Sequence, residues 1–172
     1  MALPVISADV IHMGKSTYMW IQIVHFAIDT SKSDSTCLAS LVASPGFAHD
    51  YASPYPSTHA ELTSDAVHGQ WWLSALSSDC YQPITAEQAK HDLERWANEQ
   101  DWVVPEYRQP ADAMDRLRTV HALLQTGTVY KLRNPGPDDG HDYAPVCITG
   151  FHEFAVINRD ARQLHLIVAS DD

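Results

Sequence analysis

The stretch YMWIQIVHFAI, residues 18–28, decides the fold of this chain. Its side chains are mainly aromatic or β-branched, and both of its alternating faces are mostly apolar. That pattern is typical of a strand that is covered on both sides. The stretch is the longest apolar segment in the sequence, yet it is too short to span a bilayer. It therefore predicts a buried sheet in a globular domain.

Four more segments have the composition and alternation of strands. Residues 146–157 and 164–169 are close neighbours in the sequence and predict a hairpin. A turn centred on residues 160 and 161 would pair Val156 with His165 and place Ile157 opposite Leu164. The other two expected strands cover residues 70–77 and 128–133.

Helices are expected in the middle of the chain. The polar turn at 31–35 is followed by a short apolar-faced segment, and Thr85 with Gln88 forms a capping box for a helix that ends near residue 100. A further helix begins at Pro110 and stops at Gly127. This order predicts an α+β fold: a mainly antiparallel sheet of about five strands with two to three helices packed on one face.

The length of 172 residues predicts a single globular domain over 1–172. Residues 1–15 are expected to form an extended leader, with Met13 as an alternative start, and 44–68 a long surface loop. The motif His-Asp-Tyr-Ala occurs in this loop at 49–52 and again at 141–144. Three scattered cysteines make no disulfide framework, and no secretory signal is evident, so the expected location is the cytoplasm.

The charge balance narrows the classes of partner. The chain has 22 Asp+Glu against 11 Lys+Arg, a formal net charge of −11 at pH 7. Because phosphate binding needs clustered Lys and Arg, this balance argues against nucleic acid and against anionic membranes. It suits a basic protein partner instead. The ten histidines add groups that titrate near neutral pH.

Four ionisable residues in the expected strands are candidates for proton transfer. His25 shares a strand face with Ile21, where a buried imidazole can act as a general base. His152 and His165 share one face of the expected hairpin, and Glu153 falls on the other. A carboxyl group between apolar neighbours suits a general acid. The alternatives are satisfied core histidines and an edge-strand charge that opposes aggregation.

The loop at 44–68 is aromatic, proline-rich and nearly uncharged, which favours a contact surface for a partner. A solvent-exposed insertion without a partner is the alternative. The residues expected to bind the partner are Phe47, His49, Tyr51, Tyr55 and His59.

A metal site is another use for histidines, but zinc motifs need ligands at short spacing and this chain has no such pair. No metal is therefore expected, and no organic cofactor, because the chain also lacks phosphate-binding glycine motifs. The weak candidates for Mg²⁺ or Ca²⁺ form an acidic cluster that is also typical of a solvated turn: Asp138, Asp139, His141 and Asp142.

Two functions from different classes follow. The first is an acidic interaction module, such as an inhibitor, an immunity-like protein or an accessory subunit, that binds a basic partner. The alternative is a small cofactor-independent acid/base enzyme, a lyase, isomerase or cyclase, that uses His and Glu. The sequence does not decide whether the protein is an enzyme, and it leaves the oligomeric state open.

Overall fold

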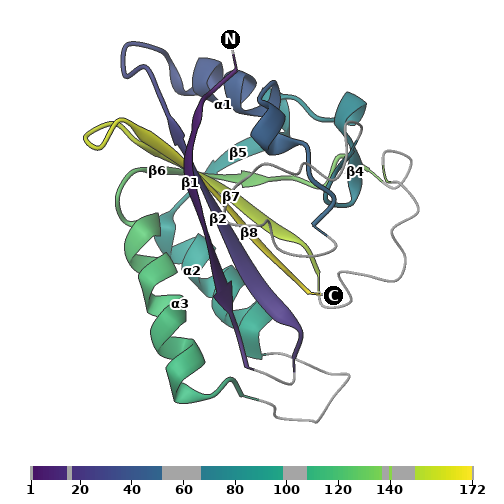
Figure 1. Ribbon diagram of the computed structural model, residues 1–172, viewed down its shortest axis with the longest axis vertical. Helices are drawn as coiled ribbons and strands as arrows, with labels where there is room; N and C mark the ends of the chain where they lie inside the picture. The colour runs from purple at the N-terminus through teal and green to yellow at the C-terminus, as the bar shows by residue number, and fades with distance from the viewer. Residues whose placement is uncertain are drawn as a thin grey trace.

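A six-stranded antiparallel sheet in the order β1-β2-β8-β7-β6-β5 forms the centre of the molecule (Figure 1). The computed structural model describes residues 2–14, 17–51, 67–98, 108–136, 140 and 150–171. Within these ranges it has three α-helices and a separate two-stranded hairpin, and it confirms the α+β fold class. The strands are β1 (Val5–His12), β2 (Met19–Ala27), β3 (Val67–His68), β4 (Trp71–Trp72), β5 (Tyr81–Ile84), β6 (Thr128–Leu132), β7 (His152–Asn158) and β8 (Gln163–Asp171). The helices are α1 (Asp34–Val42), α2 (Ala86–Asn98) and α3 (Ala111–Leu124).

Alternate side chains of β2 enter two separate cores. Trp20 and Phe26 pack with α1 on one side of the sheet, here called the α1 face. Ile21 and Ile23 pack with α2 and α3 on the other side, the α2–α3 face. Figure 1 shows α1 well apart from the α2 and α3 pair. The helices are therefore divided between the faces rather than grouped on one, because β2 is apolar on both sides.

The expected start signals of the helices are present. Ser33 accepts a hydrogen bond from the backbone N–H of Thr36 (3.2 Å) and caps α1. Before α2, the backbone N–H of Thr85 donates to Gln88 Oε1 (2.8 Å), and the N–H of Gln88 donates to Thr85 Oγ1 (3.1 Å). This confirms the capping box. Pro110 directly precedes α3, at the expected boundary.

The hairpin of β7 and β8 has the register expected from the sequence. Val156 pairs with His165, and Ile157 pairs with Leu164. Because side chains alternate along a strand, His152 and His165 point to the α2–α3 face, while Glu153 points to the α1 face. His152 and Glu153 are therefore adjacent in the chain, but their ionisable groups lie on opposite faces of the sheet.

Three segments differ from the sequence-based expectations. Residues 5–12, expected within an extended leader, form the edge strand β1; its half-exposed side chains, including Ile6 (51% exposed), give no clean apolar alternation. The short edge strand β5 was missed because Pro83 interrupts its pattern. The strand expected at 70–77 ends after Trp72 and continues as a 3₁₀ turn over Leu73–Ala75. In the described ranges, no helix is long and apolar enough to cross a membrane.

Candidate functional site

Glu153 is the centre of a buried polar cluster on the α1 face. The residue is only 1% exposed. Its Oε1 atom accepts a hydrogen bond from the hydroxyl of Tyr81, and its Oε2 atom faces Nε2 of His68 at hydrogen-bond distance. Both partners are buried as well. These three residues are called the Glu153 network below.

Sheet order brings Tyr81 to the carboxylate. Tyr81 pairs with Leu132 of β6, and β6 in turn pairs with β7, so Tyr81 and Glu153 lie on strands separated by one strand. Two strand spacings amount to about 9–10 Å. The phenol side chain is long enough to span that gap and ends in a hydroxyl group. A shorter polar side chain would not reach the carboxylate.

His68 reaches the same carboxylate from the β3–β4 hairpin. The two-residue turn of this hairpin includes Gly69 with φ +53°, a positive value typical of the first position in such turns. The ring of His68 stacks on Phe47 with centroids 3.6 Å apart. Its Nδ1 atom bonds to the backbone carbonyl of Phe47, so the imidazole is held on both edges and one face.

The number of protons in the network follows from its geometry. A carbonyl oxygen can only accept, so Nδ1 of His68 must carry a proton. A second proton lies between Nε2 of His68 and Oε2 of Glu153, because two lone pairs cannot form a hydrogen bond. The pair is therefore either imidazolium with carboxylate or neutral imidazole with carboxylic acid. In both forms it holds one transferable proton.

Tyr81 keeps its own proton in this setting. Burial, followed by the charge of Glu153, holds the pKa of Tyr81 well above its usual range. The phenol is thus a permanent donor to Oε1. The network consists of one fixed donor and one exchangeable proton on the two oxygens of a single carboxyl group.

Aromatic side chains contact the network, and two of them, Phe47 and Tyr51, belong to the loop at 44–68. Phe47, His49 and Tyr51 are fully buried, so this part of the loop packs into the core rather than forming the expected exposed surface. The ring of Tyr51 meets that of His68 edge-on (5.3 Å), and Phe151 closes another side (6.1 Å). Two further partner-binding candidates lie outside the described residues: Tyr55 and His59.

His25 and His165 meet on the α2–α3 face. They are direct neighbours in the β2–β8 register, and their Nδ1 atoms lie 2.7 Å apart. Nε2 of His25 is 3.1 Å from Oδ2 of Asp9 in β1, whose side chain is 68% exposed. Burial, and then the nearby His25, lower the pKa of His165 from 6.5 to about 4, so its ring is neutral at pH 7. These two histidines are called the His25 pair.

His152 joins neither cluster. It pairs with Ala169, four residues along β8 from His165, a separation of about 13 Å. Burial, followed by the charge of Lys131, lowers its pKa from 6.5 to about 4, and the side chain is therefore neutral at pH 7. The four catalytic candidates thus fall into three places, and Glu153 and His165 each have a close histidine partner.

The described ranges contain no group of three or more His, Cys, Asp or Glu side chains that could hold a metal ion. The weak candidates lie outside the described residues: Asp138, Asp139, His141 and Asp142.

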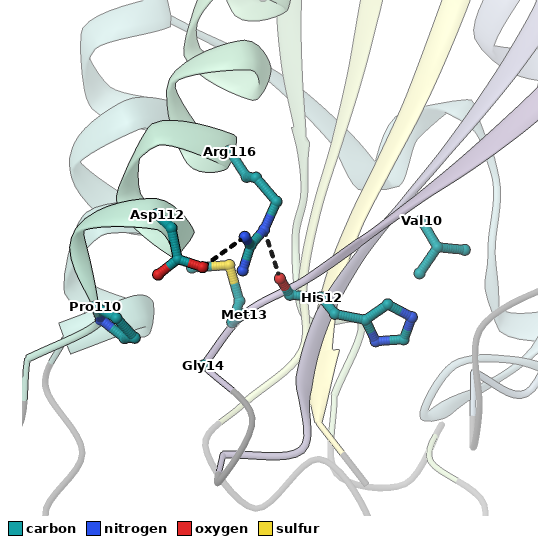
Figure 2. Close-up of a pocket in the computed structure, with 7 residues that line it drawn as sticks. All are labelled: Val10, His12, Met13, Gly14, Pro110, Asp112 and Arg116. Carbon is teal, nitrogen blue, oxygen red and sulfur yellow. Dashed lines mark hydrogen bonds and ion pairs between the residues drawn. The ribbon is translucent and has the colours of Figure 1, made fainter.

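A pocket of about 570 Å³ opens elsewhere, between the end of β1 and the first turn of α3 (Figure 2). Arg116 lines it but is engaged by protein atoms: Nε donates to the backbone carbonyl of His12 (3.0 Å) and Nη1 to Oδ2 of Asp112 (2.9 Å). Figure 2 shows the ring of His12 turned away from Arg116. The guanidinium ties β1 to α3, which gives this pocket a structural explanation.

Two residues of the Glu153 network were missed by sequence reasoning. His68 lies 85 residues and Tyr81 lies 72 residues from Glu153 in the chain. Neither belongs to a motif of fixed spacing, and their segments show no periodicity. The order of the six-stranded sheet brings Tyr81 to Glu153, and the separate β3–β4 hairpin brings His68 to it.

Comparisons with protein-family models, with curated proteins and with solved structures found no match. No relative therefore supplies a function or a set of site residues. The assignment of function depends on the geometry and chemistry of the side chains described above.

Proposed function

We propose that this protein is a small cofactor-independent enzyme that transfers a proton, with Glu153 as the acid/base group and His68 and Tyr81 as its positioning residues. The observation that carries the proposal is the buried contact of His68 Nε2 with Glu153 Oε2 at hydrogen-bond distance, which requires one exchangeable proton between the two atoms. Paired ionisable groups removed from water are the usual arrangement for acid/base catalysis near neutral pH.

The chemistry is a proton transfer at a carbon next to a carbonyl group. With His68 as imidazolium and Glu153 as carboxylate, Glu153 removes the proton, the C–H electron pair becomes a carbon–carbon double bond, and the π pair of the carbonyl group moves onto its oxygen. When that double bond is conjugated with a second one, return of the proton to the far carbon completes an isomerisation, because the electron pair on oxygen re-forms the carbonyl group. The neutral Tyr81 hydroxyl orients the carboxyl group and stabilises its charged form.

Access to the carboxylate requires movement of the surrounding rings. Glu153 is covered in the described structure, and Tyr51 and Phe151 are the rings that contact His68 edge-on. The aromatic lining favours a small substrate with an apolar or planar body. We expect such a substrate to enter when these side chains rotate outward.

Hydrogen–deuterium exchange at carbon detects this proton transfer whatever product is formed. The protein is incubated in D₂O with a panel of small ketones, 2-oxo acids and hydroxy acids, and loss of each carbon-bound ¹H signal is followed by NMR. Wild type is compared with Glu153→Gln. A matched control is Glu94→Gln, because Glu94 lies 3.9 Å from His121 in a second Glu–His pair whose glutamate is 41% exposed.

The proposal is supported if wild type and Glu94→Gln accelerate the exchange of a compound above its rate in buffer and Glu153→Gln does not. Loss of general acid/base catalysis is expected to slow exchange about 10²–10⁴-fold. Exchange that persists in a folded Glu153→Gln variant would contradict it. A panel with no compound exchanged above the rate in buffer would also count against it.

An acidic interaction module is the second candidate. Its support is the net charge of −11 and the exposure of Trp72 (43%), which offers an aromatic contact on the surface. It predicts association with a basic protein that weakens with salt and after Trp72→Ala. The same negative charge argues against binding to nucleic acid or to membranes. The unpaired Cys37 and Cys80 favour a cytoplasmic location.

A further inference from the structure

A second pocket, of about 480 Å³, lies beside α1, and no residue of the Glu153 network lines it. Three segments form it: residues 2–4, the end of β2 with the residues that follow, and the first turns of α1. Its walls include the apolar side chains of Leu3, Pro4, Ile28 and Cys37. A volume of this size is typical of sites for small molecules.

Backbone hydrogen bonds hold these walls in place. The N–H of Leu3 donates to the hydroxyl of Ser44 (2.7 Å), and the N–H of Ala27 donates to the carbonyl of Pro4 (3.0 Å). The segment before β1 is thus fastened both to the end of α1 and to β2. It forms a defined wall of the pocket.

Opposite charges line the polar side of the pocket. The Asp29 carboxylate accepts hydrogen bonds from the backbone N–H (3.0 Å) and the hydroxyl (2.7 Å) of Ser31. These bonds, the hydroxyl first, lower the pKa of Asp29, so the carboxylate is charged at pH 7. Lys32 follows in the same turn, where its N–H donates to the carbonyl of Asp29 (3.1 Å), and it is also one of the residues that line the pocket.

We infer that this pocket binds an apolar α-amino acid such as leucine or phenylalanine. The ligand ammonium faces Asp29, its carboxylate faces Lys32, and its side chain contacts Leu3, Pro4 and Ile28. A simple anionic amphiphile fits less well, because Asp29 and the net charge of −11 repel it. A simple cation fits less well because Lys32 stands on the same rim.

The test is titration calorimetry on the whole chain with a matched set of probes. L-Leucine carries both charges and an apolar side chain, N-acetyl-L-leucine lacks the ammonium, leucine methyl ester lacks the carboxylate, and glycine lacks the side chain. The variants Lys32→Met and Asp29→Asn remove one protein charge each. Lys90→Met, on the exposed side of α2, is the control for loss of a surface lysine.

We expect saturable binding of leucine that weakens about tenfold in Lys32→Met and in Asp29→Asn, and equally for the ester and the acetylated probe. Glycine should bind more weakly still, and Lys90→Met should match wild type. Absence of saturable leucine binding up to about 10 mM would overturn the inference. Leucine binding of unchanged affinity in both charge variants would overturn it too.

Discussion

The Glu153 network and the His25 pair lie on opposite faces of the same sheet, and they differ in where the carboxyl group lies relative to the buried histidine. In the first, a histidine faces a buried carboxyl group, so a proton is retained between them. In the second, two histidines face each other, and the carboxylate beside them, that of Asp9, is largely exposed. The comparison indicates that a buried carboxyl group beside a histidine fixes a shared proton between the two, whereas burial beside a second histidine lowers the pKa of His165.

The two clusters also differ in whether water can take the place of a side chain that is removed. The Glu153 network is buried, so a partner that is removed leaves a polar group in the core unsatisfied. Around the His25 pair, Asp9 already contacts solvent and water can take its place. Substitutions in the Glu153 network should therefore lower the free energy of unfolding far more than equivalent substitutions around the His25 pair.

The largest effect is expected for Glu153→Ala. It leaves the Tyr81 hydroxyl and His68 Nε2 without a partner in the core, at a cost of about 3–5 kcal/mol in the free energy of unfolding. Glu153→Gln should cost about 1 kcal/mol, because its amide can accept from Tyr81 and donate to neutral His68. Urea denaturation measures both. Equal losses in the two variants would show that the network does not depend on hydrogen bonding.

Tyr81→Phe should have the next largest effect. It removes one hydrogen bond to the buried carboxyl group without changing the shape of the ring, for a loss of about 1.5–3 kcal/mol. Tyr18→Phe is the control, since Tyr18 is exposed, and its free energy of unfolding should equal that of wild type. A Tyr81→Phe variant as stable as wild type would mean that Glu153 finds another donor.

The His25 pair should act mainly through pH. Since the pKa of His165 is about 4 in the folded protein and 6.5 when unperturbed, the unfolded chain binds more protons between these values. Stability is thus retained above pH 6.5 and lost as the pH falls toward 4. His165→Asn keeps a hydrogen-bonding group without titrating, so its melting temperature should fall less over this window.

His91→Asn, on the exposed side of α2, is the control for that series and should follow the wild-type curve. His152→Asn should flatten the curve as well, because its pKa is also held at about 4. If the curves of His165→Asn and wild type coincide, burial at this position does not keep the imidazole neutral.

The smallest effect is expected for Asp9→Asn. The carboxylate is exposed and its contact with His25 is open to solvent, so the free energy of unfolding should change by about 0.5 kcal/mol or less. Chemical denaturation at low and high salt measures it. A loss comparable to that of Tyr81→Phe would remove the contrast between the two faces.

The sequence predicted the strongest features of the fold. β2 and β8 are mostly apolar on both faces, and the capping box of α2 uses residues only three positions apart, so local chemistry determines them. Alternation along β7 likewise predicted that His152 and Glu153 point to opposite faces. The edge strands were missed because partial exposure and Pro83 weaken their patterns.

The sites needed the tertiary structure. Tyr81 reaches Glu153 only because β5 and β7 flank β6, and no local signal in the sequence specifies that order. The contact between His25 and His165 depends on the register of strands 140 residues apart. Individual candidates were thus recognisable by residue type, whereas their partners were not.

The two edges of the sheet are unequally protected against pairing with another copy of the chain, which matters at the high concentrations of expression and storage. At one edge, Pro83 removes a backbone donor from a strand of four residues, which blunts that edge against pairing. At the other, β1 runs for eight residues without proline or lysine and exposes Ile6. Aggregation of this protein should therefore begin by growth of the sheet at β1, and a lysine introduced at Ile6 is the change best suited to slow it.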